Sequence, residues 1–385
     1  MYTLKNFAIF FVLLLLADSH LVFSQQDEAV GINGFESEIR ATTTPSKGSE
    51  AQHSIGGYGE LHYNVEKPDG KESTKKLDFH RFIIFYGYAW NREWSFKSEV
   101  ELEHNVVGDD QGELELEQAY VDYHPSDLLG FQAGVVLPSA GFLNEMHEPP
   151  LFFGVERPDY HKLIIPTTWF GNGVALYGRT DSWDYKLTLM EGLNPSKFSA
   201  KSAIRGGRAK GFNADAEDLL LNARLNFTGL ENFLIGGSFT WNDASGLNTE
   251  EIRVENGVIL TEMHARFQKD KFMILAEIGN IEYDDPVESV NTALGFYVDA
   301  GYDVGELIGI EGNFIPWVRY SNINTAADTD LGGTLEEKFH RIEYSAGLNY
   351  KPLPQIVFKA DYGIVTVELD DTKTKRFNLG VGYLF

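Results

Sequence analysis

The chain has 385 residues, with 57 acidic and 32 basic side chains, a net charge of −25 and no cysteine. This charge makes nucleic acid a poor partner, because phosphate groups repel an acidic chain at long range. The absence of cysteine excludes a disulfide framework, a thiolate metal site and a cysteine nucleophile.

The first part of the chain is typical of an export signal. An apolar run from Phe7 to Leu16 follows Lys5 and precedes a short polar stretch. This run is too short to cross a bilayer, which takes about 20 apolar residues in a helix. We therefore predict a secretory signal over residues 1–24, cleaved before Gln25. Residues 25–53 are polar with little periodicity, and we expect a flexible periplasmic segment.

From Ser54 onward, apolar and polar residues alternate with a period of two, which indicates strands with one apolar face. Between Trp94 and Glu103, for example, Phe96 and Val100 share one face, and Glu99 lies on the other. In the fourth run the apolar face switches near Gln118, which predicts a β-bulge. We expect about sixteen strands, near 54–65, 76–90, 94–103, 112–124, 129–137, 169–179, 183–190, 218–227, 233–241, 258–268, 272–281, 293–303, 308–320, 338–350, 356–367 and 376–385.

The connections between these strands alternate in length. Short turns, such as 91–93, 180–182 and 269–271, are followed by longer polar segments, such as 191–217 and 242–257. This alternation is the signature of an outer-membrane barrel, and a soluble β-sandwich gives no reason for it. The sequence therefore predicts an all-β fold over residues 54–385: a transmembrane, antiparallel, up-and-down β-barrel in the bacterial outer membrane.

The last strand adds a partner to this prediction. It runs from Arg376 to Phe385, with its apolar residues on one face and small or polar residues on the other. Taken alone, it also suits the closing strand of a soluble sandwich. A final strand that ends on phenylalanine resembles the signal by which outer-membrane barrels are recognised for insertion. We therefore expect the insertion machinery to bind here, and outer-membrane lipid to surround the barrel.

The energetic cost of charge in lipid determines which face of each strand points into the barrel. A lysine or arginine on the lipid face at mid-membrane costs about 2–4 kcal/mol, so the charged face of each strand should point inward. Charges at this density predict a water-filled lumen, because unpaired charges are costly in a dry interior. The predicted pore-lining residues are Arg81, Lys97, Glu99, Glu101, Glu103, Arg224, Arg266, Arg319, Arg341, Glu343, Lys359, Asp361 and Arg376.

Two clusters of charge leave the ion preference open. Glu113, Glu115 and Glu117 follow Glu99, Glu101 and Glu103, and they could attract Ca²⁺ or another cation, or be neutralised by nearby arginine and lysine. The scattered basic residues could instead form a track for anions. No resident metal or cofactor is predicted.

The segment 138–168 differs from a solvated loop, because it is rich in proline and aromatic residues as well as charge. We expect it to fold into the lumen and narrow it; the alternative is an external cap on the rim. The predicted constriction residues are Asn144, Glu145, His147, Glu148, Glu156 and Arg157.

Several motifs, densest over residues 54–180, resemble those of porin O and P-type barrels, the phosphate-selective porin family. They are Gly57-Tyr-Gly-Glu-Leu-His-Tyr63, Asp78-Phe-His-Arg-Phe82, Ser98-Glu-Val-Glu-Leu-Glu-His104, Glu117-Gln-Ala-Tyr-Val-Asp-Tyr123, Asn144-Glu-Met-His-Glu-Pro149 and Val155-Glu-Arg-Pro158. The resemblance implies a sixteen-stranded porin, commonly trimeric, with its third loop in the channel.

The chain departs from the family in two ways. Phe170-Gly171 stands where relatives often have Arg-Glu, and the dense lysine cluster and arginine ladder of phosphate-selective members are missing from this sequence. Phosphate selectivity is therefore not carried over.

These observations predict a porin, not an enzyme, that allows passive diffusion of small hydrophilic solutes or ions. An anion- or phosphate-selective channel is the closest alternative. An outer-membrane hydrolase would need a serine, a histidine and a carboxylate brought together, and the sequence has no G-x-S-x-G motif. A structural or adhesive barrel is the third reading.

Overall fold

The computed structural model describes residues 52–385 apart from 109–111, 213 and 215. The predicted signal over 1–24 and all but the last two residues of the predicted periplasmic segment 25–53 lie outside the described residues. Within them, no helix has the length and apolar character needed to cross a bilayer.

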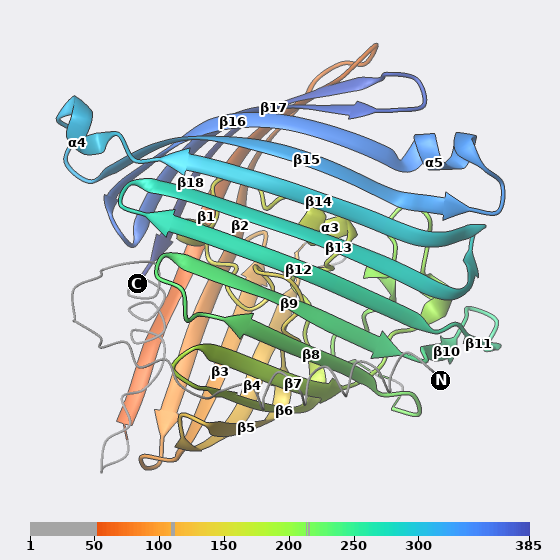
Figure 1. The fold of residues 1–385 in the computed structure, drawn as a ribbon, viewed down its shortest axis with the longest axis horizontal. Helices are drawn as coiled ribbons and strands as arrows, with labels where there is room; N and C mark the ends of the chain where they lie inside the picture. The colour runs from red at the N-terminus through yellow and green to blue at the C-terminus, as the bar shows by residue number, and fades with distance from the viewer. Residues whose placement is uncertain (1–51, 109–111, 213, 215) are drawn as a thin grey trace. The chain divides into compact units, whose positions relative to one another are not determined.

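Sixteen antiparallel strands form a closed barrel, as the sequence predicts (Figure 1). Each strand pairs with its neighbours in the chain, and the last strand closes the barrel on the first, with Tyr58 opposite Leu384 and Pro68 opposite Thr374. The strands are β1 (Gln52–Pro68), β2 (Thr74–Ala89), β3 (Trp94–Glu103), β4 (Leu114–Ser126), β5 (Leu129–Val136), β6 (Gly171–Arg179), β7 (Trp183–Met190), β8 (Leu220–Phe227), β9 (Phe233–Asn242), β12 (Val258–Lys269), β13 (Phe272–Val287), β14 (Val290–Tyr302), β15 (Asn313–Thr329), β16 (His340–Leu353), β17 (Ile356–Val367) and β18 (Lys373–Leu384).

The connections at the two ends of the barrel differ. One end, here called the turn end, carries short links such as 127–128, 270–271 and 354–355, together with the carboxyl terminus. The opposite end, called the loop end, carries the long connections 137–170, 191–219 and 243–257. The short elements outside the barrel wall are η1 (Pro149–Leu151), α3 (Tyr160–Leu163), η2 (Pro195–Lys197), η3 (Arg205–Gly207), β10 (Ser245–Leu247), β11 (Arg253–Glu255), α4 (Gly305–Ile308) and α5 (Gly333–Phe339).

The predicted start of the strand at 308–320 is wrong. The sequence pattern places a strand at 308–320, but residues 305–308 form the single turn of α4 and β15 begins only at Asn313. Gly309 ends α4 in the left-handed conformation, with φ 71°, as helix-terminating glycines commonly do. The alternating Ile308 and Ile310 belong to this exposed turn, and alternation alone cannot distinguish such a turn from a strand.

Two β-bulges control which side chains face inward. In β4, Gln118 lies opposite Glu99 and Leu116 opposite Val100, so Glu117 is the extra residue and the predicted bulge is confirmed. In β2, the partners of Glu60 and Leu61 are Arg81 and Phe79, so His80 is the extra residue. This second bulge explains why no single register suits both Phe79 and Arg81.

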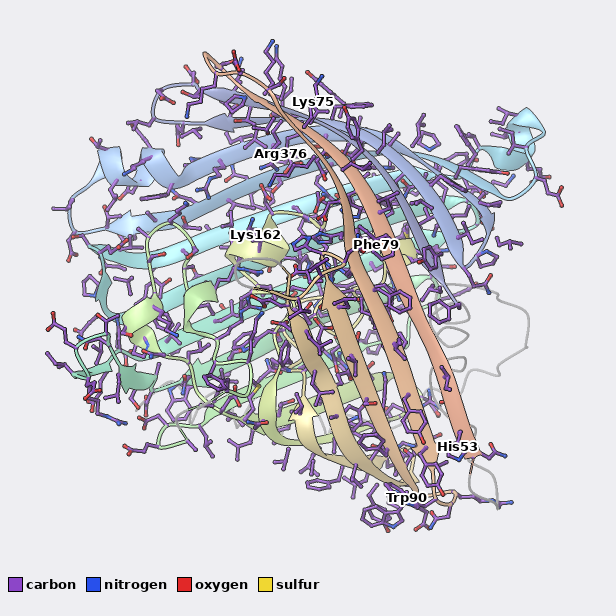
Figure 2. The ribbon with its side chains drawn as sticks, turned by 180° about the vertical axis from the view of Figure 1, so that it is seen from behind. His53, Lys75, Phe79, Trp90, Lys162 and Arg376 are labelled. Atoms are coloured by element: carbon purple, nitrogen blue, oxygen red, sulfur yellow. The ribbon has the colours of Figure 1, made fainter. Side chains whose placement is uncertain are left out.

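The outer surface of the barrel is apolar between its two rims. Large apolar side chains that alternate with inward residues are exposed along the wall, among them Val100, Val174, Ile278, Val318, Leu348 and Phe377. Aromatic side chains gather at the turn end, where Trp94 stacks on Tyr123 at 4.5 Å and Tyr88 contacts Trp90 at 5.4 Å. Figure 2 shows Trp90 at this end and Lys75 at the opposite end. An apolar band with an aromatic girdle is typical of a barrel in lipid.

We expect Val318→Arg to lower the free energy of unfolding by about 2–4 kcal/mol, because the new charge lies on the lipid face. Val318 is 57% exposed and lies in the middle of β15. Urea titration in lipid vesicles, followed by tryptophan fluorescence, measures the change. Leu331→Arg is the control, since Leu331 is exposed in a loop-end connection and its substitution should have little effect. Equal losses for the two variants would contradict the assigned lipid face.

Candidate functional site

The connection between β5 and β6, residues 137–170, is called the third loop, and it lies inside the barrel as predicted. Its α3 helix lies against β14 and β15 (Figure 1). Apolar side chains of the loop form a buried cluster with inward residues of the wall and with part of the 191–219 connection. The loop contributes Ala140, Phe142, Leu143, Phe152, Tyr160, Ile164, Ile165 and Trp169, and the wall contributes Leu260, Leu275, Ile281, Tyr297 and Ile323 among others.

Two side chains of strand β17 bind the backbone of the third loop near its middle. The Lys359 ammonium donates to the carbonyl oxygens of Phe152, at 2.9 Å, and Gly154, at 2.7 Å. Two residues further along the strand, the Asp361 carboxylate accepts the Val155 N–H at 2.7 Å. The ammonium of Lys359 thus binds backbone carbonyl groups, and the carboxylate of Asp361 binds a backbone N–H group. Together these hydrogen bonds fix the loop against this strand.

Glycines on the inner face of β18 allow the loop to approach closely. A Cβ atom at Gly382 would lie 2.3 Å from Pro149, and one at Gly380 would lie 2.9 Å from Val155. Both distances are too short for any larger side chain without movement of the loop. The small residues of the last strand are therefore explained by loop packing, a role that alternation alone does not reveal.

Glu145 anchors the beginning of the loop to β7 and β8. Its carboxylate accepts from the Ser139 hydroxyl at 2.5 Å, the Lys186 ammonium at 2.6 Å and the Arg224 guanidinium at 2.5 Å. Burial alone would raise the pKa of Glu145, but the two cations lower it well below its usual value. Asn144 joins the two ends of the loop, because its side chain bonds the Pro138 carbonyl and both backbone groups of Trp169.

The fully buried Glu277 carboxylate of β13 joins the loop to β13 and β14. Glu277 accepts from the Phe142 N–H at 2.8 Å and from the Tyr297 hydroxyl at 2.5 Å, and it lies 2.7 Å from His161 Nε2. The side chains of His161 and Glu277 have no exposed surface. Every polar contact of Glu277 is therefore with protein, so this carboxylate is part of the packing between loop and wall.

His147 of the third loop lies next to β3 and β4. Its Nε2 atom is 3.5 Å from Glu99 and 3.3 Å from Glu117, and all three side chains are buried. Burial alone would lower the pKa of His147, but the two carboxylates raise it to about 10. The imidazolium therefore balances one of the two carboxylate charges of Glu99 and Glu117.

Basic and polar partners within the chain contact several of the glutamates predicted in and beside β3 and β4. Lys210 pairs with Glu113 at 3.0 Å and also with Glu115. Arg81 lies 3.7 Å from Glu101, and the Gln118 amide donates to Glu99. These contacts favour the alternative in which basic and polar neighbours balance the glutamates.

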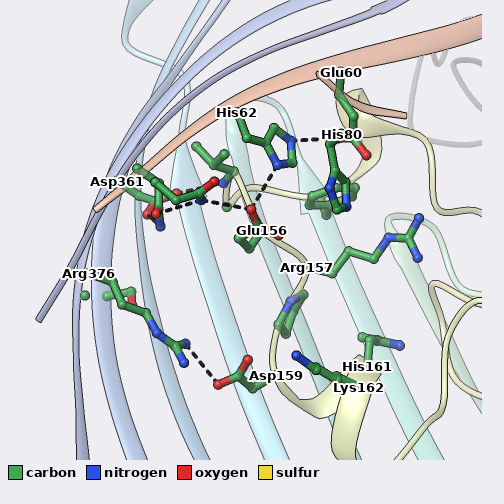
Figure 3. Close-up of a pocket in the computed structure, with 18 of the residues that line it drawn as sticks. Glu60, His62, His80, Glu156, Arg157, Asp159, His161, Lys162, Asp361 and Arg376 are labelled. Atoms are coloured by element: carbon green, nitrogen blue, oxygen red, sulfur yellow. Dashed lines mark hydrogen bonds and ion pairs between the residues drawn. The ribbon is translucent and has the colours of Figure 1, made fainter. Parts of the chain in front are cut away.

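A cavity of about 490 Å³ lies between the third loop and the wall formed by β1–β3 and β15–β18 (Figure 3). The close-up shows Glu156, Arg157, Asp159 and Lys162 of the loop opposite residues of the strands. Eight carboxylates line the cavity, together with seven lysine and arginine side chains. The formal charge of its walls is therefore close to balance, although the whole chain is strongly acidic.

The predicted site residues divide into two sets. Those that line the cavity are Arg81, Glu103, Arg319, Glu343, Asp361, Arg376, Glu156 and Arg157. Those that lie outside its lining are Lys97, Glu99, Glu101, Arg224, Arg266, Arg341, Lys359, Asn144, Glu145, His147 and Glu148.

For part of the second set, protein side chains lie beside the charged groups that were predicted to line a water-filled lumen. Arg266 is covered by the ring of Phe142, at 4.7 Å, and Lys359 by the ring of Phe152, at 3.7 Å. Lys97 lies 5.4 Å from the ring of Phe85, itself a buried inward residue of β2. Here the loop supplies hydrogen-bond partners and aromatic faces to buried charges.

Sequence analysis missed several residues that line the cavity. Asp159 accepts from Arg376 at 3.0 Å, and His62 lies 2.9 Å from Glu156 and 3.2 Å from Glu60. Asp159 and Lys162 belong to the loop segment around α3, and Arg205 enters from the 191–219 connection. The alternation of residues in β1 predicted which of its side chains point inward. It did not predict the path of the loops that bring Asp159, Lys162 and Arg205 to the cavity.

Comparison with known proteins supports the same architecture. The chain is similar to an anion-selective porin from Comamonas acidovorans (TM-score 0.59, 9% identity, 87% of this chain and 100% of that one). It is also similar to the outer-membrane channel DcaP of Acinetobacter baumannii (TM-score 0.56, 14% identity, 88% and 100%) and to OmpF of Salmonella typhi (TM-score 0.59, 10% identity, 88% and 98%). At these identities the likeness establishes the fold. No family model matches the chain.

The closed barrel with an apolar exterior and an inserted loop defines a porin-like fold of the bacterial outer membrane. An uncharacterised protein of Aquifex aeolicus (strain VF5) is 32% identical over 346 residues, which span 84% of this chain and 77% of that protein. The chain belongs to the same protein family as this Aquifex protein.

Proposed function

We propose that the chain is a porin through which small hydrophilic solutes or ions diffuse passively. The observation that carries the proposal is the polar cavity inside a closed barrel, between the wall and the third loop. The loop would act as the constriction, with Glu156 and Arg157 on its cavity side. Passive diffusion requires no conformational change of the protein, because the solute only has to fit the passage and remain hydrated.

The balance of charge favours a channel of weak ion preference. Carboxylates and basic side chains are interspersed around the cavity, as in the Asp159–Arg376 and Glu60–Arg81 pairs at 3.0 and 2.7 Å. A pore that selects anions or phosphate would present unpaired basic groups to its solute. An anion- or phosphate-selective channel is therefore the second candidate, favoured only by the arginines that reach the cavity.

Three further proposals rest on resemblance. The motifs over residues 54–180 suggest a relationship to the porin O and P-type barrels. A homotrimer is proposed by analogy with OmpT of Vibrio cholerae, which is described in a trimer form and has 15% identity and a TM-score of 0.55. The terminal Phe385 would be read by the barrel-insertion machinery after removal of residues 1–24.

The enzyme alternative finds little support at Ser98, a serine of the motif that also contains His104. A hydrolytic serine should lie within hydrogen-bond reach of a general base. The Ser98 hydroxyl instead donates to the backbone carbonyl of Tyr86, at 3.3 Å. The histidines His80 and His104 contact Asp78, on the cavity wall. Purified protein without esterase activity would be consistent with the porin proposal.

Swelling of liposomes that contain the purified protein tests the proposed diffusion. Vesicles are placed in isotonic solutions of hydrophilic sugars of increasing size, and the rate of swelling is recorded by light scattering. A porin lets small sugars enter quickly and excludes large ones. Equal swelling in protein-containing and empty vesicles, with insertion verified by protease protection, would reject the proposal and leave a structural or adhesive barrel.

We expect Lys162→Glu to shift ion preference toward cations by about fivefold. Lys162 is exposed at the cavity, so the variant changes its charge by two units without disturbing packing. Two charges at about 8 Å in water change the energy of an ion by about 1 kcal/mol before screening by salt. The reversal potential in a KCl gradient measures the shift. Lys201→Glu, on an exposed loop residue outside the cavity lining, should leave it unchanged; an equal shift would place the ion path elsewhere.

A further inference from the structure

Three histidines from different parts of the chain meet on the cavity wall. The rings of His62 on β1 and His80 on β2 stack at 4.8 Å, and the ring of His104, after β3, meets His80 edge-on at 5.6 Å. All three line the cavity. Packing of the loop against the wall does not account for His80 and His104, because their side chains contact each other, His62 of β1 and Asp78 of β2.

The bulge in β2 brings this group together. In a regular strand, His80 and Arg81 would point to opposite sides of the wall. Because His80 is the extra residue, Asp78, His80 and Arg81 all line the cavity. Bulges commonly redirect side chains beside functional sites.

The turn after β3 positions the imidazole of His104. The His104 N–H donates to the His80 carbonyl at 3.3 Å, which holds the two backbones side by side. His104 has φ 58°, in the left-handed region that is unusual for a residue with a side chain. This conformation turns its imidazole toward Asp78.

The spacing of the donor atoms suits a small divalent cation. Asp78 Oδ2 lies 2.8 Å from His104 Nδ1 and 3.5 Å from His80 Nδ1. One donor atom from each of the three residues lies within 4.8 Å of the others. Bonds of about 2.0–2.1 Å in a tetrahedral zinc site place neighbouring donors about 3.3 Å apart. Small movements of these partly exposed side chains would therefore bring three donor atoms to tetrahedral spacing.

We propose that Asp78, His80 and His104 bind one divalent transition-metal ion of the zinc class, with its fourth position open to the cavity. Two neutral imidazoles and one carboxylate favour Zn²⁺, Ni²⁺ or Cu²⁺ over Mg²⁺ and Ca²⁺, which prefer oxygen donors. His62 and Glu156, which form a second group around His80, lie beside the ion. Because both groups share His80 and a neutral imidazole binds one metal ion, we expect a single ion at the site.

Binding requires one local rearrangement. The second ring nitrogen of His80 lies 3.1 Å from Arg81 Nη2. When Nδ1 binds the metal, this second nitrogen carries the proton, so the Nη2 group of Arg81 has to move away. Arg81 keeps its contact with Glu60 through Nε, at 2.7 Å. The guanidinium therefore retains a carboxylate partner while the imidazole becomes a ligand.

Titration of the purified full-length protein in detergent with ZnCl₂ tests the site. We expect one Zn²⁺ per chain by equilibrium dialysis or calorimetry, and no competition from excess MgCl₂. His80→Ala and His104→Asn should each weaken binding about 100-fold, because loss of a direct ligand costs at least as much as loss of a supporting contact. Asparagine at position 104 tolerates the left-handed backbone, so this variant should keep the fold.

His124→Ala is the matched control, since His124 contacts Asp127 near the turn end, outside this group. It removes one histidine and should bind Zn²⁺ as the unchanged chain does. Failure of the unchanged chain to bind Zn²⁺, or full affinity in both ligand variants, would overturn the proposal. The titration does not depend on conduction, so it distinguishes failure of the metal site from failure of the proposed channel.

Discussion

Removal of residues 141–155 from the third loop will raise the single-channel conductance several-fold, because this segment fills part of the barrel cross-section. It contributes Phe142, Leu143 and Phe152 to the buried cluster inside the wall. Without them, the inward residues of β13 and β14 would face water and the passage would widen. Conductance of the purified variant in planar bilayers measures the effect, and heat-dependent gel mobility verifies that the barrel has formed.

A point variant separates constriction from general damage to the barrel. Lys359→Met removes the ammonium that holds the Phe152 and Gly154 carbonyls while keeping a side chain of similar length. We expect a freer loop and a noisier, larger conductance. Lys375→Met, on an exposed residue of β18, removes the same charge and should behave as the unchanged chain. Unaltered conductance in both the correctly inserted deletion and Lys359→Met would remove the constricting role of the loop.

Glu277→Ala will lower the free energy of unfolding by about 3–5 kcal/mol, the largest loss expected for a single substitution in this chain. The Glu277 carboxylate receives the Phe142 N–H and the Tyr297 hydroxyl and contacts His161, and all of these groups are buried. Alanine leaves three buried polar groups without their acceptor, and each such group costs about 1–3 kcal/mol. Urea unfolding in lipid vesicles measures the loss.

The control for this prediction lies on the same strand. Glu282 is exposed, and Glu282→Ala should change the free energy of unfolding by less than about 0.5 kcal/mol. Glu277→Gln keeps one acceptor oxygen and should lie between the two. A loss for Glu277→Ala no larger than that of Glu282→Ala would mean that the third loop is not packed against β13 as described.

The sequence predicts the wall of the barrel better than its contents. Alternation in 94–103 predicted β3, and the switch of face near Gln118 predicted the bulge in β4. Both signals are clear because lipid on one side imposes a strict period of two. The β10–β11 hairpin within 242–257 was missed, since three-residue strands leave almost no periodic signal. The long strands β13 and β15 extend beyond their apolar alternation, which stops where lipid no longer contacts them.

Inside the barrel, the sequence identified which residues point inward but not what covers them. Glu99, Arg266 and Lys359 were assigned to a wet lining, whereas loop residues far away in the chain bury them. These contacts join residues far apart in the chain, more than 100 positions apart in the Lys359–Gly154 bond, and no local pattern records them. The composition of 138–168 predicted the inserted loop, whereas the glycines of β18 that leave room for Pro149 and Val155 were not recognised as its contact surface.

Conductance of the purified full-length protein in planar lipid bilayers is the most direct test of a lipid-embedded barrel that passes hydrophilic solutes. The expected record shows discrete, reproducible current steps in KCl that appear only after the protein is added. The contrary result is a correctly folded barrel that inserts without any step, or a protein that stays monodisperse in detergent-free buffer and does not enter lipid.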